Sequence, residues 1–272
     1  METYIIKSQE ELNQFKDDYG YHIRGNAEFR YSAEIKGRLL VDGYLEVKSG
    51  ESIEAGESIE AGGSIKAGEY IKADGYIKAG EYIETNWFIK AGEYIKANWF
   101  IEAGGSIKAG GFIEADGSIE TGGSIEADGY IKAGRYIKAD GYIKAGGSIK
   151  AGRYIDAGGS IKAGGSIKAG EYIKADGYIK AGEYIWAGYG IISMLQITCK
   201  SFLKAGLRIF AGTCNWRNIT DEEKTITCGK LEGGKIEYGI LKETELPEEK
   251  PQGKRIKIRI DGGKIIEGEI VE

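Results

Sequence analysis

Isoleucine recurs at every sixth residue through the middle of the chain. The series runs from Ile53 to Ile191 without interruption, which gives 24 consecutive positions. The same spacing continues in apolar residues on both sides of this block. Counting backward and forward in sixes gives Ile23, Phe29, Ile35, Val41 and Val47, and then Ile197, Leu203 and Ile209. A fixed short period of this kind indicates a solenoid, in which each repeat buries its apolar side against its neighbours.

A small residue follows each isoleucine at a spacing of two. Ala55, Ala61 and Ala67 begin this second series. Residues two apart on a β-strand lie on the same face, so isoleucine and alanine are expected to point inward together. The residues between and before them, Lys or Glu and Tyr or Ser, are then expected to point outward.

Two residues remain in each hexamer and are expected to form a corner. The first is Gly, Asp or Asn in every copy from Gly50 to Gly188. These residue types tolerate positive φ at low cost, so the sequence predicts tight bends with that conformation. Three such hexamers make an 18-residue coil with three sides. The motif Asn-Trp-Phe at 86–88 recurs at 98–100, so a two-sided coil made of two hexamers is the alternative.

The unit of a short strand and a tight bend, as in Ile53-Glu54-Ala55-Gly56, resembles the repeat of hexapeptide-repeat β-helix proteins. Strings of Ile-x-Ala hexamers that end in a non-repetitive β cap look like such proteins carried by bacteriophages and mobile elements. The resemblance covers about two-thirds of the chain and implies an all-β, three-sided β-helix. In the familiar left-handed form the small residue precedes the aliphatic one, whereas here it follows. We favour a left-handed coil and leave the right-handed coil open.

The segments outside the repeat are expected to cap the solenoid, whose terminal strands otherwise expose unpaired edges. The division is 1–22 for an N-terminal α/β cap, 23–212 for the β-helix and 213–272 for a C-terminal β-hairpin cap. A strand at 4–6 and a helix from Ser8 to about Asp17 are predicted at the start. Predicted strands at 225–231, 235–242, 255–260 and 264–271 form two hairpins, with Asp261-Gly262-Gly263 as a turn and Pro247 and Pro251 in the linker.

Composition adds few constraints. The net charge of −5 excludes no class of partner, and no run of 18 apolar residues suggests a membrane segment. The start of the chain does not have the pattern of a signal peptide. The three cysteines have no metal-ligand spacing, and their odd number favours reduced thiols. We therefore expect the cytoplasm, that of a bacterial host, and no membrane association.

Catalytic chemistry is poorly represented. Among proteins of this resemblance, hexapeptide acyltransferases use a histidine as general base and usually a loop extruded from the coil to bind their cofactor. The only histidine, His22, precedes the regular repeats, and no insertion interrupts them between Ile53 and Ile191. Phosphate loops, nucleophile elbows and metal-ligand clusters are not found. We expect no enzyme, no catalytic residue, no metal and no cofactor.

The outward positions are the best candidates for a binding site. Tryptophan at an exposed corner has no obvious structural role, and aromatic side chains are enriched at interfaces. Trp87 and Trp99, with Phe88 and Phe100, are therefore predicted to contact a partner. The 12-residue spacing suggests that the two tryptophans lie about one coil apart. Stacked aromatics that only stiffen the β surface are the structural alternative.

Basic residues gather between Lys132 and Lys180. The candidate contacts there are Lys132, Arg135, Lys138, Lys144 and Arg153. Lysine interleaved with tyrosine can hold a nucleic-acid backbone, but a three-sided coil divides these charges among its faces. We therefore favour a protein partner, with nucleic acid possible.

Three functional classes follow. The favoured one is a non-enzymatic binding protein that presents a rigid β-helix surface, such as a phage inhibitor of a host defence complex of the anti-CRISPR kind. It would be a monomer or a homodimer formed through a cap. The alternative is a polymer-forming structural protein such as a fibre segment or bactofilin-like scaffold. An enzyme is disfavoured because no general base is found.

Overall fold

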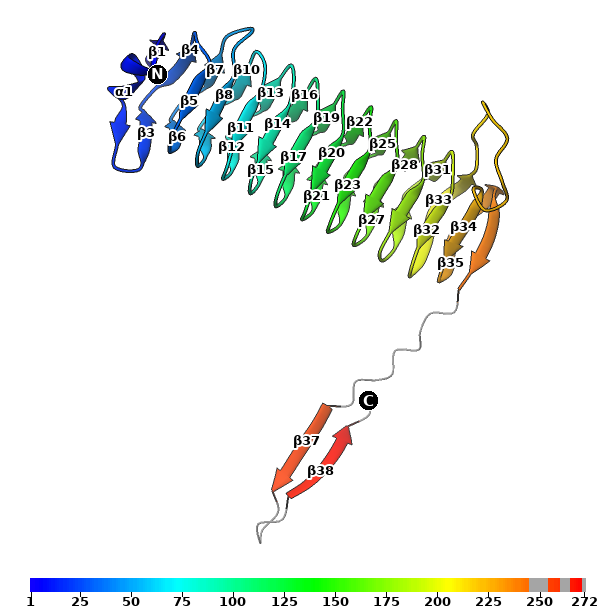
Figure 1. The fold of residues 1–272 in the computed structure, drawn as a ribbon. Coiled ribbons are helices and arrows are strands. Elements are labelled where there is room, and N and C mark those ends of the chain that lie inside the picture. Colours follow the sequence, from blue (N-terminus) through cyan, green and yellow to red (C-terminus); the bar gives the residue numbers. More distant parts are fainter. Residues whose placement is uncertain (245–253, 260–264, 271–272) are drawn as a thin grey trace.

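The structure, a computed structural model, describes residues 1–244, 254–259 and 265–270. The described chain winds into a parallel β-solenoid whose strands stack along one axis (Figure 1). Within the regular repeat each strand pairs with the strand one coil away, and paired residues are three hexamers apart in the sequence. Ile71, for example, lies beside Ile53 on one side and Ile89 on the other. The predicted all-β, three-sided coil is therefore confirmed, and the two-sided coil made of two hexamers is wrong.

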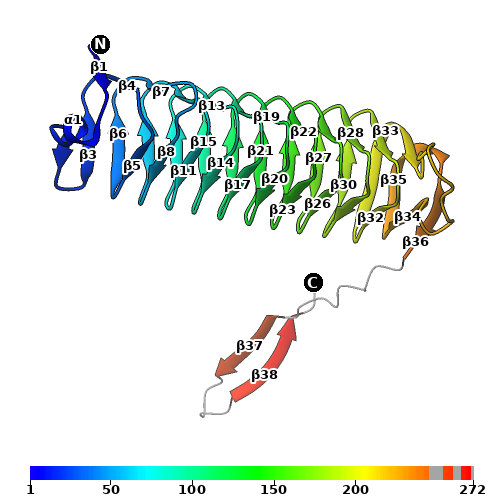
Figure 2. The same ribbon diagram turned by 45° about the horizontal axis from the view of Figure 1, so that its top comes forward.

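The three sides are named here after one strand of each, the β8 face, the β9 face and the β10 face. Successive strands along the chain pass from one face to the next (Figure 2). The β8 face consists of β5 (Ala33–Ile35), β8 (Ile53–Ala55), β11 (Ile71–Ala73), β14 (Ile89–Ala91), β17 (Ile107–Ala109), β20 (Ile125–Ala127), β23 (Ile143–Ala145), β26 (Ile161–Ala163), β29 (Ile179–Ala181), β32 (Ile197–Cys199), β34 (Thr225–Cys228) and β36 (Ile240–Glu243).

The other two faces are joined into one sheet by β33 (Phe202–Ala211), which pairs with strands of both. The β9 face consists of β3 (Gly20–Ile23), β6 (Arg38–Val41), β9 (Ile59–Ala61), β12 (Ile77–Ala79), β15 (Ile95–Ala97), β18 (Ile113–Ala115), β21 (Ile131–Ala133), β24 (Ile149–Ala151), β27 (Ile167–Ala169) and β30 (Ile185–Ala187). The β10 face consists of β1 (Thr3–Ile6), β4 (Asn26–Phe29), β7 (Leu45–Val47), β10 (Ile65–Ala67), β13 (Ile83–Thr85), β16 (Ile101–Ala103), β19 (Ile119–Thr121), β22 (Ile137–Ala139), β25 (Ile155–Ala157), β28 (Tyr172–Ala175) and β31 (Gly190–Ser193).

Isoleucine and alanine fill the interior, as their spacing predicts. The isoleucines of the repeat are 0% exposed and its alanines at most 3%. Identical residues stack on one another along each face, so the core consists of continuous columns rather than a single cluster. Burial of an isoleucine side chain contributes about 1.5–3 kcal/mol, and the repeat supplies one in every hexamer.

The first coils share the spacing of six but use the two inward columns differently. Ile53 lies beside Ala33, and Ile65 lies beside Leu45. Five residues separate Val47 from Ile53, where three suffice elsewhere, and the two extra residues preserve the spacing of six while exchanging the columns. The early apolar residues are buried as expected, but their assignment to the isoleucine column was wrong. They occupy the later alanine column: Ile23, Phe29, Ile35, Val41 and Val47.

The regular corners do not use positive φ, contrary to the prediction. Within the described residues, positive φ in this part of the chain is confined to Gly20, Gly50 and Gly212. Gly50 lies in the enlarged corner before Ile53, and Gly212 begins the next irregular segment. At a regular corner such as Gly80, a Cβ atom would overlap the carbonyl oxygen of Gly62 in the neighbouring coil. The corners of neighbouring coils therefore stack closely, although residues with a Cβ, such as Asp74 and Asn86, occupy the same position in other copies.

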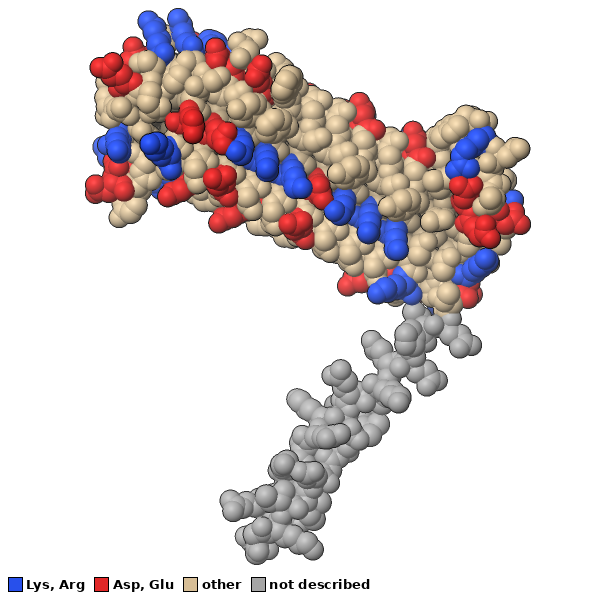
Figure 3. Space-filling model, in the orientation of Figure 1, with Lys and Arg blue, Asp and Glu red and all other residues tan. Residues whose placement is uncertain are grey.

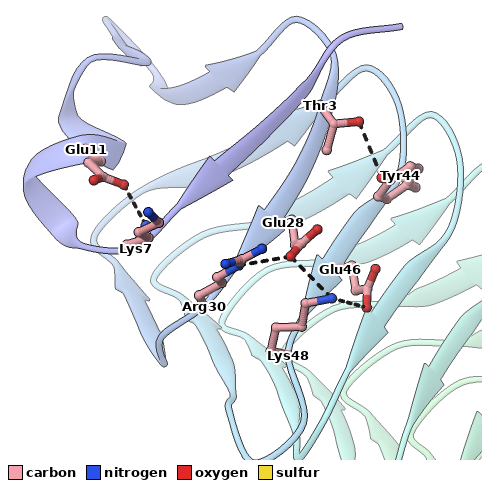
Figure 4. A network of polar contacts seen from close by, with 8 residues as sticks. All are labelled: Thr3, Lys7, Glu11, Glu28, Arg30, Tyr44, Glu46 and Lys48. Carbon is pink, nitrogen blue, oxygen red and sulfur yellow. Dashed lines mark hydrogen bonds and ion pairs between the residues drawn. The ribbon is translucent and has the colours of Figure 1, made fainter.

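A short cap covers the N-terminal end of the solenoid. Strand β1 pairs in parallel with β4, so the predicted first strand belongs to the β10 face itself. Helix α1 (Gln9–Asn13) begins at Ser8, whose hydroxyl accepts a hydrogen bond from the Glu11 amide. The Glu11 carboxylate in turn accepts one from the Lys7 amide at 2.7 Å (Figure 4). Leu12 seals the end of the core and is 0% exposed.

The predicted helix is shorter than expected. It ends at Asn13 rather than near Asp17, because the chain turns into β2 (Lys16–Asp17), which pairs antiparallel with β3. Among the described residues, no helix has the length and apolar character needed to span a membrane.

Strand pairing continues beyond residue 212, where the sequence pattern led us to end the β-helix. Strand β34 pairs in parallel with β32, β36 with β34, and β35 (Lys230–Tyr238) with β33. The predicted antiparallel hairpin of 225–231 and 235–242 is therefore wrong, because these strands add to the same parallel stack. Alternating apolar residues occur in both arrangements, so the pattern alone could not distinguish them.

Two features complete the C-terminal part. Residues 213–224 form an extra loop between β33 and β34, within which Arg217 binds the Glu223 carboxylate through two nitrogens at 2.9 and 2.7 Å. Strands β37 (Lys254–Arg259) and β38 (Ile265–Ile270) pair antiparallel, which confirms the second predicted hairpin. Its predicted turn at 261–263 and the linker prolines Pro247 and Pro251 lie outside the described residues.

Candidate binding surfaces

The two exposed tryptophans occupy different edges of the solenoid. Trp87 lies at the corner between β13 and β14, where the β10 face meets the β8 face. Trp99 lies between β15 and β16, where the β9 face meets the β10 face. Each side chain is 59% exposed. A spacing of two hexamers is two-thirds of a three-hexamer coil, so the expectation that they lie about one coil apart was wrong.

Each tryptophan borders a groove. The groove at Trp99 has a volume of about 480 Å³ and lies over Ser118, between the rings of Phe100 and Tyr136. The groove at Trp87 has a volume of about 670 Å³ and lies over Gly105 and Ser106. Phe100, Ser118 and Tyr136 follow one another at intervals of one coil, and a serine in a column of rings leaves the space of one ring unfilled. Both grooves therefore follow from the sequence of the outward columns.

Aromatic side chains form a separate stacked column on each face. The rings of Tyr82 and Phe100 on the β10 face lie 4.7 Å apart between centroids and within 6° of parallel. On the β8 face Tyr70 and Phe88 stack in the same way at 4.7 Å. The β9 face has the longest run, which consists of Tyr76, Tyr94, Phe112 and Tyr130. Phe88 and Phe100 therefore take part in structural stacks as well as lining the grooves.

The predicted basic contacts do not form one patch. Lys132 lies on the β9 face, Lys138 on the β10 face and Lys144 on the β8 face, while Arg135 and Arg153 lie on the edge between the β9 and β10 faces. Four of the five are in ion pairs with residues one coil away. The partners are Glu114 for Lys132 at 2.9 Å, Glu120 for Lys138 at 2.7 Å, Glu126 for Lys144 at 2.6 Å and Glu171 for Arg153 at 2.9 Å.

These ion pairs shift the pKa values of their members. Hydrogen bonds from the lysines lower the pKa of the three glutamates Glu114, Glu120 and Glu126 below its usual range. The same bonds raise the pKa of each lysine partner. Burial, together with a hydrogen bond to Glu114, raises the pKa of Tyr130 to about 12. At neutral pH the pairs are therefore charged and Tyr130 is a neutral donor, so these groups stabilise the outer surface of the coil.

A lysine column on the β8 face escaped the sequence analysis. Lysine occupies the outward strand position at six of seven consecutive coils, with one acidic interruption (Figure 3). The members are Lys72, Lys90, Lys108, Glu126, Lys144, Lys162 and Lys180. Reading every eighteenth residue, rather than a linear window, would have revealed it.

The β10 face carries the opposite pattern. Glu84, Glu102 and Glu120 follow one another on adjacent strands, bordered by Lys66 and Lys138. Closer to the N-terminus, Glu28 and Glu46 continue the acidic column. Lys48 binds both carboxylates, at 3.3 and 3.1 Å (Figure 4). The outer surface thus has a basic face and an acidic face that meet at the edge of Trp87.

The remaining reactive groups have structural surroundings. His22 lies on β3, with its Nε2 2.7 Å from Asp42 Oδ1. Cys199 and Cys228 are buried free thiols, and burial raises the pKa of the Cys199 thiol to about 12. The residues that the structure describes contain no group of three His, Cys, Asp or Glu side chains placed to hold a metal ion.

Comparison with known proteins adds no assignment: no family model, curated protein or solved structure matches the chain. The repeat architecture and the outer columns are therefore the basis for the functional argument.

Proposed function

We propose that this chain is a non-enzymatic binding protein that presents a rigid β-helix surface to a protein partner. The observation that carries the proposal is the pair of exposed tryptophans, each beside an open groove. Aromatic anchors next to pockets account for much of the energy in protein interfaces. The grooves are set in stacked β-strands, so little conformational entropy is lost when a partner fills them.

The alternative from the sequence was a structural polymer joined end to end. Such joining needs an open terminal coil, whereas α1 and β2 cover the N-terminal end and Leu12 closes the core there. This cap favours a binding protein. A cytoplasmic location is part of the proposal and is supported by three cysteines that are all free thiols.

The proposal is tested by removing the tryptophans. Trp87→Ala and Trp99→Ala are expected to leave the circular dichroism spectrum unchanged, because both side chains lie outside the core. Capture of the partner from a bacterial lysate by the immobilised protein, quantified by mass spectrometry, is expected to fall about tenfold or more for each variant. Tyr189→Ala is the matched control, since Tyr189 lies on the same edge as Trp99 and is 58% exposed.

Equal capture by wild type and both tryptophan variants would show that the grooves do not bind the partner.

One form of the proposal is an inhibitor of a bacterial defence complex of the anti-CRISPR kind. For that form, expression of the chain in a bacterium with an active defence system is expected to restore phage plaques. Trp87→Ala and Trp99→Ala are expected to reduce that restoration, and unrestored plaque counts with the wild-type chain would contradict this form.

A further inference from the structure

The basic column of the β8 face and the acidic column of the β10 face have the same pitch. Both consist of outward residues on adjacent parallel strands, which repeat at about 4.8 Å. Over five coils the β8 column has the signs −, +, +, +, −. Its members are Glu54, Lys72, Lys90, Lys108 and Glu126. The β10 column has +, −, −, −, + in Lys66, Glu84, Glu102, Glu120 and Lys138.

Each column is unfavourable in an isolated chain. Like charges on directly neighbouring strands destabilise a sheet, and both columns place three together. The outer members relieve this through ion pairs with the bordering residues, as Lys72 does with Glu54 and Glu84 with Lys66. Among the described residues, the central members Lys90 and Glu102 form no ion pair. For each column, a facing surface with the opposite sign pattern and the same pitch would neutralise the unpaired charges.

We propose that the β8 face of one copy binds the β10 face of a second copy, with Lys90 opposite Glu102 and the two solenoid axes antiparallel. This rests on the proposed function, in that it takes the patterned faces as binding surfaces, and it names the partner as a second copy of this chain. The partner of the lysine column must carry carboxylates spaced at about 4.8 Å. Stacked β-strands provide this spacing, and the β10 face of a second copy carries such carboxylates.

The antiparallel orientation follows from chirality. When two faces of the same chiral object meet with their axes antiparallel, the strands on the two faces run in the same direction. The charged column then lies over the charged column, and the aromatic column over the aromatic column. With parallel axes the strands on the two faces run in opposite directions, and the charged column of each copy then lies over the aromatic column of the other. The antiparallel register also extends to Lys144 opposite Glu46 and Lys162 opposite Glu28. With parallel axes, a sideways shift that brought the charged columns together would place Lys162 opposite Lys174.

The aromatic columns support the same register independently of charge. Tyr70 of the β8 face comes opposite Ser118, where a ring is missing between Phe100 and Tyr136. Tyr82 of the β10 face comes opposite Ser106, in the other groove. Each groove thus receives a tyrosine of the second copy.

The tryptophans meet in this register as well. Phe88 of one copy lies opposite Phe100 of the other. The residue before each is a tryptophan, which lies at the edge where the strands of that face begin, called here its upstream edge. Trp87 therefore comes beside the Trp99 of the second copy. The repetition of Asn-Trp-Phe at a spacing of two hexamers gains a physical reason, because it places one motif on each of the two surfaces that join.

The β9 face offers a weaker match. Its lysine run, Lys132, Lys150 and Lys168, is bordered by Glu114 on one side and by Trp186 on the other. One acidic border is therefore missing, and Lys66 of the β10 face would lack a charged partner. The residue at its upstream edge beside Ser148 is Gly147, so the match to Trp99 is also lost.

The contact is expected to be weak and open-ended. Seven coils span roughly 34 Å along the axis, and a face is roughly 15 Å wide, so the contact buries about 1,000 Å² in total. This area lies at the low end for specific interfaces. Because each copy uses a different face, a pair leaves one face of each kind free, and association continues laterally.

Charge exchange tests the inference. Sedimentation velocity at about 10–100 μM and low salt is expected to show concentration-dependent association that fades at high salt. Lys90→Glu and Glu102→Lys should each weaken it at least about tenfold, since each replaces an attraction by a repulsion. The double variant K90E/E102K should return to within about threefold of wild type. Lys90→Glu places an acid between Lys72 and Lys108, so folding is not expected to suffer.

Lys150→Glu makes the same charge change at the centre of the β9 run and is expected to leave association unchanged. A wild-type chain that stays monomeric over this range overturns the inference, as does a double variant that stays weak or an effect of Lys150→Glu in place of Lys90→Glu. Host-protein capture that depends on Trp87 and Trp99 in a monomeric chain would reject self-association and keep the proposed function. Capture unaffected by those residues would reject the proposed function.

Discussion

Replacing Ile119 by aspartate is expected to divide the solenoid in two. Ile119 is 0% exposed and lies between Ile101 and Ile137 in a continuous column. An unpaired carboxylate at this position loses the burial of isoleucine and has no hydrogen-bond partner in the core. We expect a loss of about 5 kcal/mol or more in the stability of the central coils. Because each coil contacts only its neighbours, the damage should be greatest there.

Limited proteolysis followed by mass spectrometry checks this result. Cleavage is expected to appear within the coils next to residue 119, and the thermal transition followed by circular dichroism should broaden or fall. Glu120→Gln is the matched control: it removes an outward ion pair with Lys138 and is expected to change stability by about 1 kcal/mol or less. Equal protease resistance in I119D and wild type would contradict a packed interior at this position.

Replacing Leu12 by aspartate is expected to open the N-terminal end of the stack. Leu12 is 0% exposed and covers the core from α1. A charge there should displace the helix and expose a terminal coil whose strand edges are able to pair with other chains. We expect light scattering to show large aggregates, with a loss of soluble protein of about tenfold.

Glu10→Gln on the same helix is the control, because Glu10 is exposed and its substitution leaves the seal intact. If L12D remains as soluble as wild type and E10Q, the helix is not required to protect the end. The two substitutions thus separate the role of the cap from that of helix charge.

The repeat predicted most of the fold because every hexamer obeys one steric rule. An inward isoleucine, an inward small residue and a two-residue corner are compatible only with short stacked strands, and pairing at intervals of three hexamers followed. The exchange of columns at Val47 could not be predicted, since two inserted residues left the spacing of six intact. The conformation of the corners was also missed, because Gly80 and the other regular corner residues stack closely on the neighbouring coil without positive φ.

The exposure of the two candidate tryptophans was predicted, but their arrangement was not. Trp87 and Trp99 are exposed as expected, yet a spacing of two hexamers in a three-hexamer coil separates them onto two edges. The division of neighbouring lysines among the three faces was predicted, but the lysine column that results on the β8 face was not. The column through Lys90 and the groove over Ser118 depend on residues one coil apart, which become neighbours only once the coil length is known. The parallel strands after residue 212 could not be told from a hairpin, because both show the same alternation.

The distance between two outward residues of one column tests the three-sided coil most directly. Spin labels on K72C and K180C, with the three native cysteines replaced by alanine, are separated by six coils of the β8 face. Double electron–electron resonance is expected to give one narrow distribution near roughly 29 Å, from six spacings of about 4.8 Å. A distribution near roughly 43 Å, as nine coils of two hexamers each would give, or a broad one without a maximum, would contradict the account.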